Sequence, residues 1–284
     1  MLRRPLSAPG LHLAVLCSAL LLAGCAAPGP RIDTRYTATA QDSRVQFIVL
    51  HYTVGNFPSA LKTLTQTPVS SHYLVDDESG AVLRLVDEDR RAFHAGVSQF
   101  DGVAGLNAAS IGIEIVNPGL ASGSSTRFTP FAPAQIRAVV ALVRDVAQRH
   151  GVRPHRIVGH SDIAPGRKLD PGPLFPWREL VAAGLVPWPD ETQVAQWRAE
   201  MANQPLPPAA WFQQRLATLG MAVPGTGQWD TATRDALMAF QMKYRPALFT
   251  GRPDLETAAW LQVATTPGGL LLVGADGVAR PYRP

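Results

Sequence analysis

The sequence predicts an α/β protein in which a mixed central β-sheet is flanked by helices, followed by a small all-α domain of three helices. Short apolar segments typical of buried strands alternate with one long amphipathic helix in the first part of the chain. The composition then changes near Trp188, and a near-repeat between helical segments follows. With 284 residues, 46% of them hydrophobic, the chain is long enough for one sizeable domain and one small one.

Four segments of the first domain have the composition of strands or strand pairs. Residues 45–52 form a continuous apolar strand that ends near His51, and residues 71–86 read as two strands joined by a turn. In residues 110–116 three isoleucines alternate with other residues, which leaves Glu114 on the opposite face of that strand. A short strand over residues 156–160 ends at His160.

One long helix is expected between the third and fourth of these segments. Pro133 suits its first turn, and apolar residues recur after it at spacings of three and four. Gly151 stands where a left-handed residue would close such a helix. The catalytic domain is accordingly placed at residues 42–188.

The C-terminal part contains two related motifs, TGQWDTAT at residues 226–233 and TGRPDLET at residues 250–257. Both have the form T-G-x-x-D-x-x-T, and each aspartate is expected to cap the helix that follows. We therefore predict a three-helix domain over residues 209–264. The preceding polar, proline-rich segment 189–208 is interpreted as a linker, with a short helix inside it as an open alternative, and residues 265–284 as a C-terminal tail.

The N-terminus has the pattern of an exported lipoprotein. Arg3 and Arg4 precede an apolar run that is too short for a stable transmembrane helix, and the run ends in LLAGC at Cys25. This ending resembles a lipobox, which implies a signal peptide at residues 1–24, lipidation of Cys25 and a tether at residues 25–41. An ordinary export signal with an incidental cysteine is the alternative.

Charge and cysteine content exclude several classes of function. The formal charge of +4 falls to +2 when the two signal-peptide arginines are removed, which is too little to argue for nucleic-acid binding. The chain has two cysteines, one in the signal peptide and one at the lipidation site. We therefore expect no disulfide and no thiolate metal site in the mature chain.

Polar side chains at three strand ends indicate a metal centre. His51 and His160 end two of the expected strands, and Asp170 lies in the loop that follows His160. Two imidazoles and one carboxylate are the usual protein ligands of a catalytic zinc ion. Lys168 lies two residues from Asp170, so an extended backbone would point both side chains the same way. Glu114 is a candidate general base.

Several motifs together resemble the amidase-2 family of zinc-dependent N-acetylmuramoyl-L-alanine amidases. They are LHYT, SHYLVDDESG, AFHAG, SIGIEIVN and VGHSDIAPGRKLDPGP, in this order within residues 42–186. The resemblance implies an amidase and peptidoglycan-recognition-like fold and a zinc site made by His51, His160 and Asp170. It also implies Glu114 as the catalytic carboxylate and Lys168 as the group that stabilises the transition state.

The expected substrate cleft includes His94, Tyr52 and Ser71. His94 lies in the AFHAG motif and is also the main alternative candidate for a metal ligand. The remaining histidines receive no chemical role.

The C-terminal helices resemble a peptidoglycan-binding domain, and the whole chain resembles the AmiD-type outer-membrane lipoprotein amidases. The resemblance implies that peptidoglycan and muropeptides, including anhydro forms, are the partners. It also implies a monomer anchored by lipid to the periplasmic face of the outer membrane. A peptidoglycan-recognition protein that binds without hydrolysis is the alternative function.

Overall fold

The computed structural model describes residues 29–284, so the predicted signal peptide and Cys25 lie outside the described residues. The chain separates into two compact units, one ending at Asp42 and one over Ser43–Pro284. The described part of the first unit contains no helix or strand. Among the described residues, we find no helix with the length and apolar character needed to cross a membrane.

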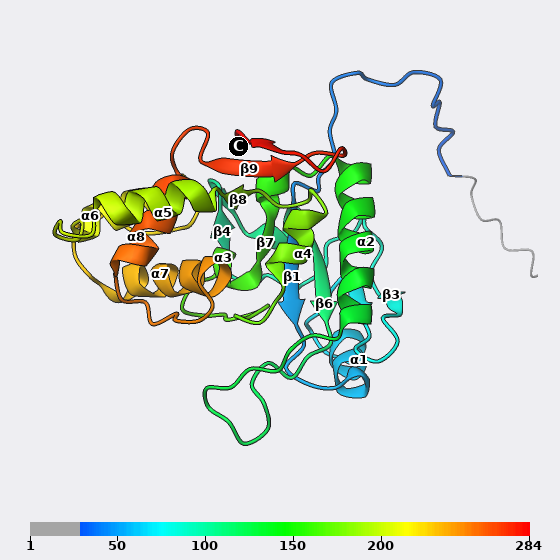
Figure 1. The fold of residues 1–284 in the computed structure, drawn as a ribbon. Coiled ribbons are helices and arrows are strands. Elements are labelled where there is room, and N and C mark those ends of the chain that lie inside the picture. The colour runs from blue at the N-terminus through cyan, green and yellow to red at the C-terminus, as the bar shows by residue number, and fades with distance from the viewer. Residues whose placement is uncertain (1–28) are drawn as a thin grey trace, which may run out of the picture. The chain divides into compact units, whose positions relative to one another are not determined.

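The centre of the second unit is a five-stranded mixed sheet with the order β3-β2-β6-β1-β7 (Figure 1). Strands β2, β6, β1 and β7 run parallel, and β3 pairs with β2 in the antiparallel direction. The bounds are β1 (Phe47–Tyr52), β2 (Tyr73–Val75), β3 (Val82–Arg84), β6 (Ser110–Ile115) and β7 (Ile157–Gly159). The mixed sheet predicted from the sequence is confirmed.

Helix α2 (Pro133–His150) covers one face of this sheet. The isoleucines of β6 and the even-numbered residues of β1 pack against its buried stripe, which includes Val139 and Val143. The helix begins at its proline and is closed by Gly151, whose φ of 67° is left-handed. The expected helix and both of its end signals are confirmed.

The opposite face of the sheet packs on the C-terminal helices α6 (Ala209–Thr218), α7 (Thr231–Tyr244) and α8 (Leu255–Ala264). Phe47 and Val49 of β1 belong to the same buried cluster as Phe212 of α6 and Phe240 of α7. The three predicted helices are present, and they share one hydrophobic core with the sheet.

The two T-G-x-x-D-x-x-T motifs fold in the same way. Asp230 and Asp254 each accept a hydrogen bond of 2.8 Å from the amide three residues later, at the start of α7 and α8. A buried glutamine holds each loop: Gln213 accepts from the amide of Gly227, and Gln241 accepts from the amide of Gly251. The predicted aspartate caps are confirmed, and each glutamine bonds to the loop with both ends of its side chain.

Several elements extend or add to those expected from the sequence. Residues 189–208 contain α5, which packs on α8, and residues 265–284 form two strands that extend a sheet begun by β8. The domain boundaries drawn from the sequence stay predictions. The additional elements are α1 (Phe57–Gln66), β4 (Gln99–Phe100), β5 (Val103–Ala104), α3 (His160–Ile163), α4 (Trp177–Ala182), β8 (Trp188–Pro189), α5 (Glu191–Glu200), β9 (Leu270–Val273) and β10 (Ala279–Pro281).

The shared core predicts that a change in α7 destabilises the sheet as well. Phe240→Ala should lower the free energy of unfolding by about 3–5 kcal/mol, because it leaves a cavity in that core. Denaturant unfolding, followed by far-UV and near-UV signals together, should show one transition moved to lower denaturant. Leu248→Ala, at an exposed position, is the control. Two separate transitions would contradict a common core.

Candidate metal centre and catalytic cleft

The strand register brings the predicted polar residues to one edge of the sheet. His51 of β1 lies directly beside Glu114 of the parallel strand β6. On the other side of β1, β7 ends at Gly159 and His160 begins α3. Because the carboxyl ends of parallel strands meet at the same edge, residues from distant parts of the chain converge there.

Three donor atoms of this edge face one another. The Nδ1 atoms of His51 and His160 are 2.9 Å apart, and each lies 3.0 Å from Oδ2 of Asp170. All three side chains are buried. A triangle of this size leaves a point about 2 Å from every corner, which is the ordinary length of a bond from zinc to nitrogen or oxygen. The three residues can therefore hold a metal ion.

The outer nitrogen of His51 begins a chain of hydrogen bonds that fixes its tautomer. The Leu106 carbonyl can only accept, so the Ser110 hydroxyl donates to it at 2.6 Å and in turn accepts from Nε2 of His94 at 3.2 Å. The remaining nitrogen of His94, Nδ1, then accepts from Nε2 of His51 at 3.0 Å. This leaves a lone pair on Nδ1 of His51, directed toward the triangle.

His160 is oriented in the same sense. Its Nε2 donates to the Ala95 carbonyl at 3.1 Å, which leaves a lone pair on Nδ1. Two lone pairs and a carboxylate oxygen thus point at one another, and a cation between them relieves their repulsion. Hydrogen bonds from the outer nitrogens are the usual support of metal-binding histidines. The donor set fits a bound metal ion.

Both histidines of this hydrogen-bond chain, His51 and His94, are held in the neutral form that the arrangement requires. Burial, with a smaller contribution from the neighbouring His160, lowers the pKa of His51 to about 4. Burial, followed by the proximity of His51, holds the pKa of His94 well below its ordinary value. Gly112 makes room for His94, since a Cβ at that position would lie 2.5 Å from Cγ of the ring.

Glu114 has the features of a proton-transfer group. Its Oε2 is buried and has no hydrogen-bond partner among residues 29–284. Burial is the main cause that raises the pKa of this carboxyl well above its usual value, and the charge of Asp170 raises it further. A cation bound nearby would favour the ionised form. An unpartnered carboxylate oxygen beside three metal-binding atoms can accept a hydrogen bond from a water molecule or a substrate.

These residues line a cleft of about 190 Å³. Lys168, Tyr52 and His94 all contribute to its wall. Ser71 differs from the expectation: it is fully buried and does not line the cleft, whereas its neighbour Ser70 does. The geometry therefore does not support a substrate contact for Ser71, because its side chain points into the protein interior.

The sequence did not indicate one wall of the cleft. Helix α1 contributes Ala60 and Leu64, and its N-terminus is capped by Asn56, which accepts from the amide of Ser59. The capping asparagine followed by a proline in the first turn is the signal that could have predicted this helix. Val54 also lines the cleft, with a φ of 54° that is rare for a β-branched residue.

Comparison with known proteins identifies the family. N-acetylmuramoyl-L-alanine amidase AmiD of Escherichia coli K12 is 40% identical over 259 residues, which cover 86% of this chain and 94% of that protein. The chain belongs to the N-acetylmuramoyl-L-alanine amidase family. Residues 41–173 of this amidase match the family itself, and residues 207–261 match a peptidoglycan binding domain. The resemblance inferred from the sequence motifs is confirmed.

Two solved structures are similar to this amidase over most of its length. E. coli AmiD in complex with the substrate anhydro-N-acetylmuramic acid-L-Ala-D-gamma-Glu-L-Lys has a TM-score of 0.75 and 40% identity, covering 82% of this chain and 93% of the other. AmpDh3 of Pseudomonas aeruginosa with an anhydromuramic pentapeptide has a TM-score of 0.76 and 38% identity, covering 82% and 96%.

The hydrogen-bond chain predicts that His94 supports the metal centre from behind. His94→Phe keeps a ring against Gly112 but removes the acceptor for Nε2 of His51. We expect metal affinity to fall about 10- to 100-fold, as for other residues that orient metal ligands, when measured by competition with a chelator. Phe93→Leu, at the partly exposed neighbouring position, should leave the affinity unchanged. An unaltered affinity in His94→Phe would refute this role.

Proposed function

We propose that this amidase hydrolyses the amide between N-acetylmuramic acid and the L-alanine of the peptidoglycan stem peptide, with zinc as its metal. The observation that carries the proposal is the triangle of donor atoms in the same cleft as the unpartnered oxygen of Glu114. Membership of the amidase family supports it. The ligands, Glu114 and Lys168 come from one chain, which supports the expectation of a monomer.

The metal would be held by His51, His160 and Asp170. Zinc held there would lower the pKa of water at the site to about 7 and would polarise the carbonyl of the scissile amide. Imidazole nitrogens and a carboxylate are ligands that zinc commonly takes in catalytic sites. The support for zinc over other divalent metals is this donor set together with the membership of the family.

Glu114 and Lys168 would carry out the remaining chemistry. Glu114 accepts the proton of the attacking water and returns it to the leaving amine, which a buried carboxyl with a raised pKa can do in both directions. Lys168 reaches into the cleft and places a positive charge near the oxygen that becomes negative in the transition state. The burial of His51, His160 and Asp170 lowers the local dielectric constant, which would strengthen both interactions.

The substrates would include anhydro-muropeptides as well as wall fragments. The similar structures of AmiD and AmpDh3 contain anhydromuramic peptides, which supports the first class. The match of residues 207–261 to a peptidoglycan binding domain supports the second, because binding the polymer would raise its concentration at the cleft. A role in turnover and recycling of the wall is consistent with both.

We further propose lipid anchoring at Cys25, with the catalytic unit on the periplasmic face of the outer membrane. The support is the LLAGC ending of the apolar N-terminal run and the absence of Asp at the next position, Ala26. The polar and proline-bearing residues after Cys25 suit a tether of this kind.

Products from sacculi and from purified anhydro-muropeptides test the function directly. Mass spectrometry should show free stem peptides beginning with L-alanine, and their release should stop with a chelator and return with zinc. Protein that contains stoichiometric zinc but releases no peptide would favour the alternative, a recognition protein that binds without hydrolysis.

The assignment of Glu114 predicts a separation of metal binding from turnover. Glu114→Gln should keep zinc and lower kcat by about 10²–10⁴-fold, because the amide cannot accept a proton. Asp170→Ala is the matched contrast and should lose zinc and activity together. Metal content and kcat on a soluble anhydro-muropeptide measure both effects. Normal turnover of Glu114→Gln would remove this residue from the mechanism.

The anchoring proposal predicts a change of cell fraction without a change of chemistry. Cys25→Ser should move the protein from the membrane fraction to the soluble periplasmic fraction, because no acyl chain can be attached. Fractionation followed by immunoblotting measures the distribution, and activity on soluble muropeptides serves as the control. An unchanged membrane association would contradict lipidation at Cys25.

A further inference from the structure

The loop that carries His160 and Asp170 is connected to helix α7 by a buried ion pair. Asp162, two residues after His160, accepts at Oδ2 from the amide of Gly159 at 2.9 Å. The same oxygen accepts from Nζ of Lys243 on α7 at 3.0 Å. A single carboxylate therefore connects the turn that begins α3 to a helix of the peptidoglycan-binding region, 81 residues away in sequence.

The environment of Lys243 fixes its ammonium group from two sides. The side chains of Lys243 and Asp162 are only 10% and 7% exposed. Nζ also lies 4.1 Å from the ring centre of Trp177, a favourable position for a cation over an aromatic face. Burial is the largest single influence and lowers the pKa of Lys243, but the charge of Asp162, the nearby Tyr244 and the hydrogen bond to Asp162 together raise that pKa above its ordinary value. The lysine is charged at neutral pH.

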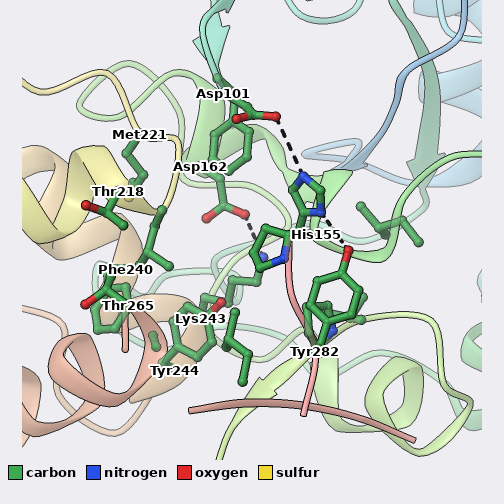
Figure 2. A pocket seen from close by; sticks show the side chains of 18 of the residues that line it. Asp101, His155, Asp162, Thr218, Met221, Phe240, Lys243, Tyr244, Thr265 and Tyr282 are labelled. Carbon is green, nitrogen blue, oxygen red and sulfur yellow. Dashed lines mark hydrogen bonds and ion pairs between the residues drawn. The ribbon is translucent and has the colours of Figure 1, made fainter. Parts of the chain in front are cut away.

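The ion pair borders a cavity of about 550 Å³ on the side of α7 and the C-terminal strands (Figure 2). Asp162 and Lys243 form part of its wall. On another part of the wall, the hydroxyl of Tyr282 and Nδ1 of His155 form a hydrogen bond of 2.7 Å. The polar contact with Lys243 supplies a fixed point.

A second contact between α7 and the same loop lies at Gly166. A Cβ on this glycine would come within 2.1 Å of Oδ2 of Asp235, so the side chain of this α7 residue lies against the loop backbone. Gly166 also has a φ of 76°, which favours glycine. The loop between the two metal-binding residues is thus contacted by α7 at two separate positions.

We propose that Lys243 is a positioning residue for the metal centre, acting through Asp162 on the turn that presents His160. The inference rests on the proposed zinc-dependent function and extends it: a helix of the peptidoglycan-binding region takes part in building the catalytic site. Loss of the ammonium group releases the turn and leaves the Asp162 carboxylate buried without its cation, so the ligand geometry loosens.

Zinc affinity of the full-length protein tests this role. Lys243→Met keeps a long apolar side chain, and we expect zinc to bind about 10- to 100-fold more weakly in chelator competition, as when other supports of metal ligands are removed. Activity on a soluble muropeptide, which needs no wall binding, should fall when zinc is limiting. Arg234→Met, at an exposed position of the same helix, is the matched control and should keep the wild-type affinity.

A double-mutant cycle establishes the path through Asp162. Asp162→Asn retains an acceptor for the Gly159 amide but breaks the ion pair, so it should weaken zinc binding comparably. The double variant should bind zinc no more weakly than the weaker-binding single variant, because both changes break the same ion pair. If Lys243→Met does not fold, Asp162→Asn alone provides the same measurement of zinc affinity.

The outcomes separate this inference from the proposed function. Lower thermal stability with unchanged zinc affinity in Lys243→Met, or additive losses in the double variant, would overturn the positioning role while wild-type amidase activity stands. Wild-type protein that binds no zinc, or that releases no peptide with zinc, would instead refute the proposed function.

Discussion

The site depends on the placement of β1 between two parallel neighbours. Pairing with β6 sets His51 beside Glu114, and pairing with β7 brings the chain to His160 at the same edge. Alternation along β1 then directs Phe47 and Val49 into the core shared with the C-terminal helices, while His51 continues the same face into the cleft. One face of one strand thus serves both the packing and the metal-binding atoms, and a shift of register by one residue would disrupt both.

The metal-binding atoms are oriented by hydrogen bonds that face away from the cleft. The Leu106 carbonyl fixes the proton of Ser110, and this determines in turn which nitrogen of His94 and of His51 carries a proton. These hydrogen bonds join protein groups alone, so they select the tautomers without a contribution from metal or substrate. Burial keeps the imidazoles of His51 and His94 neutral, which makes their electron pairs available at neutral pH.

The sequence predicted the sheet, α2 and the three C-terminal helices because their periodicity and end signals are local. His51, Glu114, His160 and Asp170 could also be predicted, since polar residues near the ends of apolar strands, and in the loop that directly follows one, are conspicuous. The support by His94 could not, because the space above Gly112 exists only after strand pairing. Ser71 was misplaced because two adjacent serines are indistinguishable until their side-chain directions are known. The segment 189–208 was interpreted as a linker from its polarity, although its helix packs on α8.

The common core of the sheet and the C-terminal helices limits how such a protein can recombine. A binding domain on a flexible tether can be exchanged between enzymes by joining chains at the linker. Here Phe212 and Phe240 cover the strand that carries His51, so a replacement domain would have to match that surface as well as its ligand. Exchange of wall-binding specificity in this architecture therefore proceeds by changing residues on the outside of the helices, with the inner residues retained.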